Sequence, residues 1–298
     1  MTYLAWCQRN RVSPHDLLRS CAARVAALAA RSYVAGPRLS DALGLCQRLW
    51  AGSLSTTICY WNIKGAPPRM VANECLDAIR ALGAQRLDGD VALKAPALGF
   101  DPGLHEELVE AARAHGVRLH FDSHSPNDAA ETFALIGRCA EKYANVGCTL
   151  AGRWRRSLAD ADWAVERRLQ VRVVKGQWED AERPATDPRS GFQALIERLA
   201  GRGVPVAVAT HDLALARASL LRLLAAGTKC ELELLYGLPL GPAAALAREL
   251  DVPVRVYMPY GKAWLPYTIS QIRDDPRLLG RLGCDLLLRS GFRLRGAL

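Results

Sequence analysis

The chain has 298 residues, of which 50% are hydrophobic and 23% are charged, the balance of a globular protein without low-complexity segments. No uninterrupted apolar run approaches the roughly 20 residues that a transmembrane helix needs, so we expect no membrane span. The net charge of +9 comes from basic residues dispersed in short clusters, with no recognition helix, which argues against a nucleic-acid partner.

The nine cysteines include no Cys-x-x-Cys pair, and several lie in apolar runs typical of strands. We expect reduced thiols that pack as small hydrophobic side chains, and therefore a cytoplasmic protein. The N-terminal thirty-odd residues are rich in Arg and Ala with Asp16 as their single acid, which is also the composition of an organellar transit peptide.

Short runs rich in apolar and β-branched residues recur along the chain, with helical patterns between them. They predict eight strands, at residues 57–62, 91–94, 117–122, 146–150, 171–175, 204–210, 230–235 and 252–257. Segments between them carry apolar residues at helical spacing and end near Gly or Asp, as at 102–116, 192–203 and 241–251.

Strands that alternate with helices predict an α/β fold, and eight parallel strands close into a (β/α)8 barrel of the TIM type. We predict an N-terminal helical extension over residues 1–50, which caps the bottom or side of the barrel, and a catalytic barrel domain over residues 51–298. An open doubly wound sheet is the alternative, but it needs a Gly-rich phosphate turn after an early strand, and the sequence has none.

Polar residues end the predicted strands. In a barrel of this type the strand ends face a common mouth, and bulky apolar side chains fill the layers beneath. Because an unpaired buried charge is strongly unfavourable, so many polar ends predict a site at the mouth. The residues concerned are Asn62, Lys94, Asp122, Arg172 with Lys175, Thr210 with His211, Glu233, and Tyr257.

The fifth strand carries two cations on opposite faces, since alternate side chains of a strand point to opposite sides. One of Arg172 and Lys175 therefore points into the barrel. A guanidinium held there suits a delocalised anion or an electron-rich ring.

A metal site is a competing interpretation, because His120, Asp122 and His124 alternate along one segment. However, residues 125–128 have the pattern of a turn and a helix start, and no Glu or His pair at helical spacing completes a metal shell. Local hydrogen bonding is the simpler role for the two histidines. A serine nucleophile has no Gly-x-Ser-x-Gly turn to support it.

Four strand-end motifs in order resemble the proline dehydrogenase family of FAD-dependent barrels: VRVVKGQWEDAE, VAVATHD, CELELLYGL and VRVYMPYGKAWLPY. Upstream, the lead-in and the second and third strands are also similar, in RSYVAGPRLSDAL, DVALKAPAL and VRLHFDSHSPNDAAETFALI. The resemblance runs from residue 31 to residue 276. Because the lead-in matches a structural element of the family, it implies a helix rather than a cleaved transit peptide at the N-terminus.

The resemblance implies a FAD across the barrel mouth that accepts a hydride at N5 from the carbon next to a substrate nitrogen. An arginine near N5 would favour the reduced, anionic flavin. The implied cofactor contacts are Arg172, Val174, Lys175, Gly176, Gln177, Trp178, Thr210, His211, Glu233 and Asp274. The implied catalytic and substrate-binding residues are Arg172, Lys94, Asp122 and Tyr257, with Tyr267, Ser270 and Gln271 as further substrate contacts.

The chain departs from the family at several of these positions. Where the family has two adjacent arginines that clamp the carboxylate of proline, this chain has Ser270 and Gln271. Charge-assisted hydrogen bonds contribute about 1.5–3 kcal/mol each, so their loss weakens proline binding on the order of a thousandfold. The usual glutamines of strands four and seven are Ala151 and Glu233, and Trp178 aligns with either of two family aromatics.

We therefore predict a flavin-dependent dehydrogenase or oxidase acting on the C–N bond of an amine, imino acid or related compound other than free L-proline. A redox-inactive barrel that binds or scaffolds is the main alternative, and a metal-dependent hydrolase is the third. The sequence leaves open the substrate, the electron acceptor, the oligomeric state and the stacking of Trp178 on adenine.

Overall fold

The computed structural model describes residues 34–180 and 187–261. Eight parallel strands pair in chain order and close into a barrel, because the last strand returns to pair with the first. All eight predicted strands are confirmed, and the largest shift of an end is at residue 260 against the predicted 257. The strands are β1 (Ser55–Tyr60), β2 (Gly89–Leu93), β3 (Arg118–Phe121), β4 (Val146–Ala151), β5 (Gln170–Val174), β6 (Val206–Ala209), β7 (Cys230–Leu235) and β8 (Val254–Tyr260).

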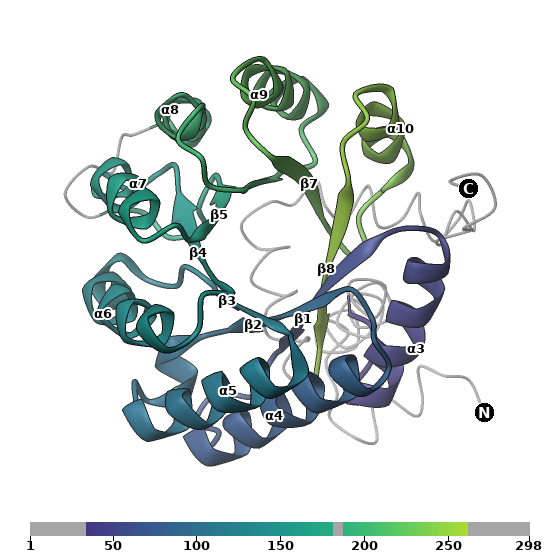
Figure 1. Ribbon diagram of the computed structural model, residues 1–298, viewed down its shortest axis with the longest axis vertical. Coiled ribbons are helices and arrows are strands. Elements are labelled where there is room, and N and C mark those ends of the chain that lie inside the picture. The colour runs from purple at the N-terminus through teal and green to yellow at the C-terminus, as the bar shows by residue number, and fades with distance from the viewer. Residues whose placement is uncertain (1–33, 181–186, 262–298) are drawn as a thin grey trace, which may run out of the picture.

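Helices surround the strands on the outside (Figure 1). In residues 34–180 and 187–261, one α-helix precedes β1, and one follows each strand from β1 to β7. A short 3-10 helix, η2 (Ala95–Leu98), follows β2 directly. The helices are α3 (Leu39–Ala51), α4 (Pro68–Ala84), α5 (Pro102–His115), α6 (Pro126–Lys142), α7 (Ser157–Glu166), α8 (Pro188–Leu199), α9 (Leu213–Ala225) and α10 (Gly241–Glu249). The predicted (β/α)8 fold is confirmed.

The predicted N-terminal extension is described only from residue 34 onward. Helix α3 packs against β1 and β8, so it covers the outside of the barrel where its first and last strands meet. The rest of the extension lies outside the described residues, and the division of the chain at residue 50 stays a prediction.

Acidic residues and prolines set the starts of several helices. Asp101 accepts hydrogen bonds from the backbone of Gly103 and Leu104 at 2.8 and 3.2 Å, and so caps the free N–H groups of α5. Asp187 caps α8 in the same way, and both helices have proline as their first residue. Proline fits there because its missing N–H would have no partner in the helix.

The apolar core lies between the strands and the helices. In β5, Val171 and Val173 are fully buried on this outer side, and the neighbouring strands follow the same alternation. The six cysteines in the described ranges are buried free thiols, as predicted for small hydrophobic side chains (Cys46, Cys59, Cys75, Cys139, Cys148 and Cys230). Hydrophobic burial of this shell holds the helices to the barrel.

The predicted apolar filling of the barrel interior is wrong. Below the mouth, the inward positions carry charged and polar side chains. Asp90, His120, Gln170, Arg172, Glu233 and Arg255 are buried, and Glu231 is partly exposed. Small residues make room for them, since a Cβ on Gly147 would come within 2.5 Å of the His120 ring. Burial of these charges is tolerated because each has an ion-pair partner of opposite sign.

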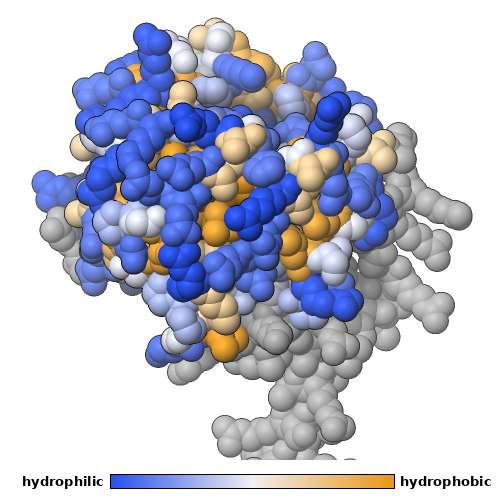
Figure 2. Space-filling model, turned by 60° about the horizontal axis from the view of Figure 1, so that its bottom comes forward, coloured by the Kyte–Doolittle hydropathy of each residue, from blue (hydrophilic) through white to orange (hydrophobic). Residues whose placement is uncertain are grey.

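Ion pairs link neighbouring helices around the outside of the barrel. They join α4 to α5, α5 to α6, α7 to α8, α8 to α9 and α9 to α10 (Arg69–Glu107, Lys142–Glu106, Arg198–Asp162, Arg222–Glu197 and Arg217–Glu249). The face in Figure 2 is accordingly mostly hydrophilic, with hydrophobic side chains in small groups between the polar ones. No helix in the described ranges combines the length and apolar composition that a bilayer crossing requires.

Candidate active site

A cavity of about 380 Å³ opens at the carboxyl ends of the strands, within the range of roughly 300–1,000 Å³ of small-molecule sites. All eight strands, or the loops that follow them, contribute to its lining. The lining residues are Trp61, Lys94, Asp122, Ser123, His124, Thr149, Arg172, Val174, Gly176, Gln177, Trp178, Ala209, Thr210, His211, Glu233, Leu234, Leu235 and Tyr257.

The cavity brings together every predicted site residue in the described ranges except Asn62 and Lys175. The Lys175 ammonium instead lies 3.6 Å from the carboxylate of Asp212, which also pairs with Arg189. Four predicted residues, Tyr267, Ser270, Gln271 and Asp274, lie outside the described residues.

The prediction for Asn62 is wrong, because its side chain is not part of the cavity lining and its amide donates to the carbonyl of Ile63. Strand β1 ends two residues earlier than predicted, so Trp61 lines the cavity instead. Sequence reasoning also missed Thr149, which lines the cavity from β4. In both cases the alternation of inward and outward side chains along the strand could have indicated that these residues point into the barrel.

Arg172 forms the floor of the cavity and is held from two sides by carboxylates. Its Nε donates to Oε2 of Glu233 at 2.7 Å, and its Nη1 donates to Oδ1 of Asp122 at 2.7 Å. Weaker contacts run from Nη1 to Thr149 Oγ1 at 3.4 Å and from Nη2 to Thr57 Oγ1 at 3.5 Å. The prediction that one cation of this strand points into the barrel is confirmed, because Arg172 is 3% exposed.

The charges of this group follow from burial and pairing. Burial alone would lower the pKa of Arg172, but Glu233 and Asp122 raise it above its ordinary value, so the guanidinium stays charged. Burial raises the pKa of Glu233, and the neighbouring guanidinium opposes that rise. The guanidinium is therefore charged, and its proximity favours the charged form of Glu233 against the effect of burial.

Asp122 and Tyr257 form a second contact above the guanidinium. The Tyr257 hydroxyl donates to Oδ2 of Asp122 at 2.6 Å, and the Tyr257 ring lies 5.1 Å from the Arg172 guanidinium. Burial and the Asp122 carboxylate raise the pKa of Tyr257 well above its usual range, so the phenol keeps its proton. Asp122 thus links the floor of the cavity to its wall.

The thiol of Cys59 lies 3.7 Å from the same Asp122 oxygen, to which it donates a weak hydrogen bond. Burial raises the pKa of Cys59 to about 11. A thiol that stays protonated at neutral pH is a poor nucleophile, and Cys59 is fully buried outside the cavity lining.

Lys94 presents its ammonium to the face of Trp61, at 5.3 Å from the ring centroid. In residues 34–180 and 187–261 no carboxylate pairs with this ammonium, in contrast to Arg172. Lys94 is therefore the cavity cation whose charge is least cancelled by its described neighbours.

The loop after β5 forms one wall of the cavity and lies close to β4. Gly176 has a φ of +92°, and a Cβ on it would come within 2.9 Å of the Cβ of Ala151. A side chain here would push the loop away from β4. Further along, the Trp178 carbonyl accepts a hydrogen bond from the Trp154 indole at 2.9 Å, which fixes the end of the loop.

His211 follows the neighbouring strand β6, and its Nε2 accepts the backbone N–H of Leu235 at 2.8 Å. Burial lowers the pKa of His211, so the ring is neutral and carries its proton on Nδ1. Next to it, Thr210 Oγ1 accepts the backbone N–H of Asp212 at 3.2 Å. These contacts hold the loop between β6 and α9 against β7.

The two histidines of the metal interpretation make local contacts. His120 is buried beside Thr149 Oγ1 at 3.1 Å, and His124 stacks on Trp178 and approaches Asp128 at 3.7 Å. Among the described residues no three His, Cys, Asp or Glu side chains are grouped so that they could hold a metal ion.

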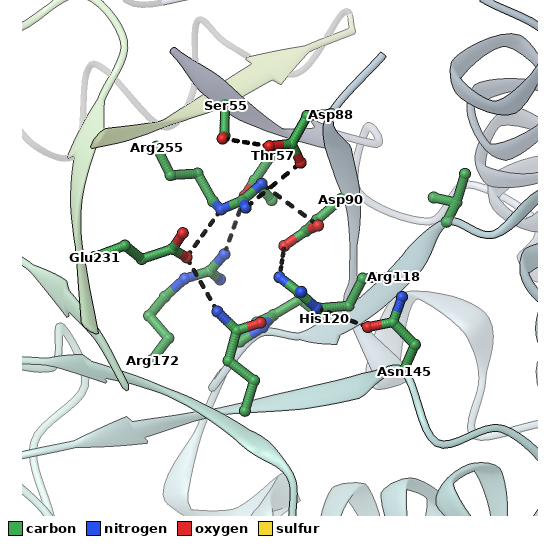
Figure 3. Close-up of polar contacts among 12 residues, drawn as sticks. Ser55, Thr57, Asp88, Asp90, Arg118, His120, Asn145, Arg172, Glu231 and Arg255 are labelled. Carbon is green, nitrogen blue, oxygen red and sulfur yellow. Dashed lines mark hydrogen bonds and ion pairs between the residues drawn. The ribbon is translucent and has the colours of Figure 1, made fainter. Parts of the chain in front are cut away.

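A second polar network lies beneath Arg172, towards the amino ends of the strands (Figure 3). Arg255 donates to Glu231 at 2.9 Å and lies 3.4 Å from Asp90, which pairs with Arg118 at 3.0 Å. Figure 3 shows the side chains of Glu231 and Arg255, on the neighbouring strands β7 and β8, pointing toward one another inside the barrel. The site is thus supported from below by paired charges rather than by an apolar plug.

Known proteins with similar sequences are proline dehydrogenases. Proline dehydrogenase 1 of Bacillus subtilis is 27% identical over 267 residues, which cover 84% of this chain and 87% of that protein. Proline dehydrogenase of Deinococcus radiodurans is 26% identical over 274 residues, covering 83% of this chain and 86% of the relative. No family model matches the chain.

Solved structures with the same fold are the proline utilization A proteins of Bdellovibrio bacteriovorus and Corynebacterium freiburgense. Their TM-scores are 0.70 and 0.69, at 14% and 16% identity, over 82% and 88% of this chain. The chain spans only 32% of the length of either protein. The sequence relatives confirm the resemblance that the strand-end motifs predicted, and the solved structures share the fold: the chain is similar to proline dehydrogenases over most of its length.

Proposed function

We propose that this chain is a flavin-dependent oxidoreductase of the proline dehydrogenase type. It binds FAD at the barrel mouth and oxidises the C–N bond of a small nitrogen compound other than free L-proline. The observation that carries the proposal is the convergence of Lys94, Asp122, Arg172 and Tyr257 in one cavity, in a homologue of proline dehydrogenases.

The lining of the cavity fits a flat redox ring. Val174, Gly176, Ala209 and Leu235 give it apolar or backbone surfaces, while the Arg172 guanidinium gives it a charged floor. A bound FAD supplies the hydride-accepting chemistry, and the protein supplies binding, orientation and electrostatics.

The residues of the site have distinct proposed roles. Arg172 and the segment 174–178, with Thr210, His211, Glu233 and Asp274, hold the cofactor. Lys94 and Tyr257 line the substrate side of the cavity, and Asp122 orients Tyr257 through their 2.6 Å hydrogen bond. This hydrogen bond fixes the phenol in one direction, so the substrate meets a preorganised wall.

The substrate lacks a free carboxylate at the place where proline has one. Ser270 and Gln271 offer neutral hydrogen bonds there instead of two cations, and Tyr267 precedes them. An ester, an amide, a carrier-bound compound or an enlarged analogue would meet this requirement. The guanidinium of Arg172 does not replace the missing clamp, because two carboxylates already occupy it.

The test begins with the absorption spectrum of the purified protein, before and after incubation with FAD. Turnover is then measured with an artificial electron acceptor on L-proline and on its methyl ester and amide. We expect flavin bands, and turnover of the neutral derivatives that exceeds that of L-proline. The matched control is Gln271→Arg, which returns one cation and is expected to shift the preference towards L-proline.

Two results would contradict the proposal in different ways. A protein that binds no FAD under any condition would favour the redox-inactive binding barrel. A flavoprotein that oxidises L-proline as well as the ester would refute the inference from Ser270 and Gln271 while leaving the flavin chemistry in place.

A further inference from the structure

The single positive charge of Arg172 faces two negatively charged neighbours. Two carboxylate oxygens, from Glu233 and Asp122, each lie 2.7 Å from the guanidinium. One cation between two anions leaves the group with a net charge of about −1, since at such distances the charges act as a unit. The floor of the cavity is therefore not the positive surface that an isolated arginine would make.

The two carboxylates are not equivalent. Asp122 is also held by Tyr257 and by the thiol of Cys59. Glu233 is 3% exposed, it bonds Arg172 through Oε2, and its Oε1 has no hydrogen-bond partner among the described residues. The guanidinium is thus the one hydrogen-bond partner of this carboxylate among the described residues, and Arg255 adds a weaker electrostatic attraction.

We propose that Glu233 is a positioning and charge-setting residue, which neutralises Arg172 and makes the cavity floor unfavourable to a ligand that gains negative charge. The inference rests on the proposed flavin function and deepens it. Reduction adds negative charge to a flavin ring unless a proton follows. A neutralised floor therefore makes the bound FAD a weaker oxidant, and it favours uncharged or cationic substrates over anionic ones.

Glu231 provides a matched control on the same strand and the same face, one layer lower. It pairs with Arg255 at 2.9 Å and also accepts a hydrogen bond from Gln170 at 3.0 Å. It does not line the cavity. Removal of its charge tests whether any buried anion in the barrel has the same effect, or only the anion that touches Arg172.

The experiment compares the two-electron reduction potential of bound FAD in the wild type, Glu233→Gln and Glu231→Gln, by reductive titration against a reference dye. In Glu233→Gln we expect the reduced flavin to bind about tenfold more tightly relative to the oxidised form, a rise of about 30 mV. Its reduced spectrum should shift towards the anionic form, and the potential of Glu231→Gln should change less.

Equal potentials in the wild type and Glu233→Gln would overturn the inference, and so would an equal rise in both variants. If Glu233→Gln does not fold or does not retain FAD, Asp122→Asn removes the other carboxylate and must raise the potential in the same direction. A wild type without FAD binding would overturn the proposed function and this inference together, whereas an unchanged potential would overturn this inference alone.

Discussion

Replacement of Arg172 by methionine tests whether the buried ion pairs at the cavity floor determine the stability of the barrel. The substitution removes the cation that lies 2.7 Å from each of two carboxylates, one of them 3% exposed. Removal of one partner of a buried ion pair is destabilising by about 3–5 kcal/mol, because an uncompensated charge is left behind. We expect Arg172→Met to lose stability in this range at pH 7.

A double variant separates the charge effect from the loss of packing. In Arg172→Met with Glu233→Met, both members of the more buried pair are replaced by apolar side chains of similar length. Such replacements are often neutral or stabilising, so the double variant should recover at least half of the loss. Asp122 keeps its hydrogen bond from Tyr257 in both variants.

The pH dependence of the single variant has a defined sign. Burial raises the pKa of Glu233, and without Arg172 nothing of comparable strength opposes that rise. The folded variant therefore binds a proton at a pH where the unfolded chain has lost it, and stability falls as pH rises. The loss of unfolding free energy in Arg172→Met relative to the wild type should be small near pH 5 and grow towards pH 8.

The assay is urea unfolding followed by circular dichroism at a series of pH values, with the same protein concentration for all variants. A loss below about 1 kcal/mol in Arg172→Met would refute the reasoning, because it would mean that the buried carboxylates do not need the cation. A double variant no more stable than the single one would refute it as well.

Two further comparisons use matched pairs of variants. Gly176→Ala should reduce the free energy of unfolding by about 1 kcal/mol or more beyond the effect of Gly203→Ala. Both positions have positive φ, but only the first would bring a Cβ against Ala151. Equal losses of stability in urea unfolding would contradict the close contact. Arg255→Met should reduce the free energy of unfolding by about 3–5 kcal/mol, whereas Arg217→Met, whose partner is on the surface, should unfold like the wild type. A surface variant as unstable as the buried one would contradict this prediction.

The barrel fold could be predicted because its signals are local. Each strand is a short run of apolar and β-branched residues, and each helix between them has its own spacing, with caps such as Asp101 and Asp187 at the start. The strand ends also indicated the site, since parallel strands in a barrel must bring their carboxyl ends to one mouth. These features could therefore be predicted from the order of residues along the chain.

The pairing of the inward charges could not be predicted in the same way. The sequence places Arg172 and Glu233 on strands that are not neighbours, and only the assembly of β5, β6 and β7 in the curved sheet brings them to 2.7 Å. For the same reason the lower network of Arg255, Glu231 and Asp90 was missed, although polar residues at alternate positions of apolar strands were its visible signal.

The sequence by itself determined the number and order of the elements, the end of the barrel that carries the chemistry, and the resemblance to proline dehydrogenases. The tertiary structure alone decided which charges cancel one another, and so the electrostatic character of the cavity floor. The physical reason is that propensity, periodicity and capping act between residues close in the chain, whereas Coulomb interactions depend on distances that exist only after the strands have closed into a ring.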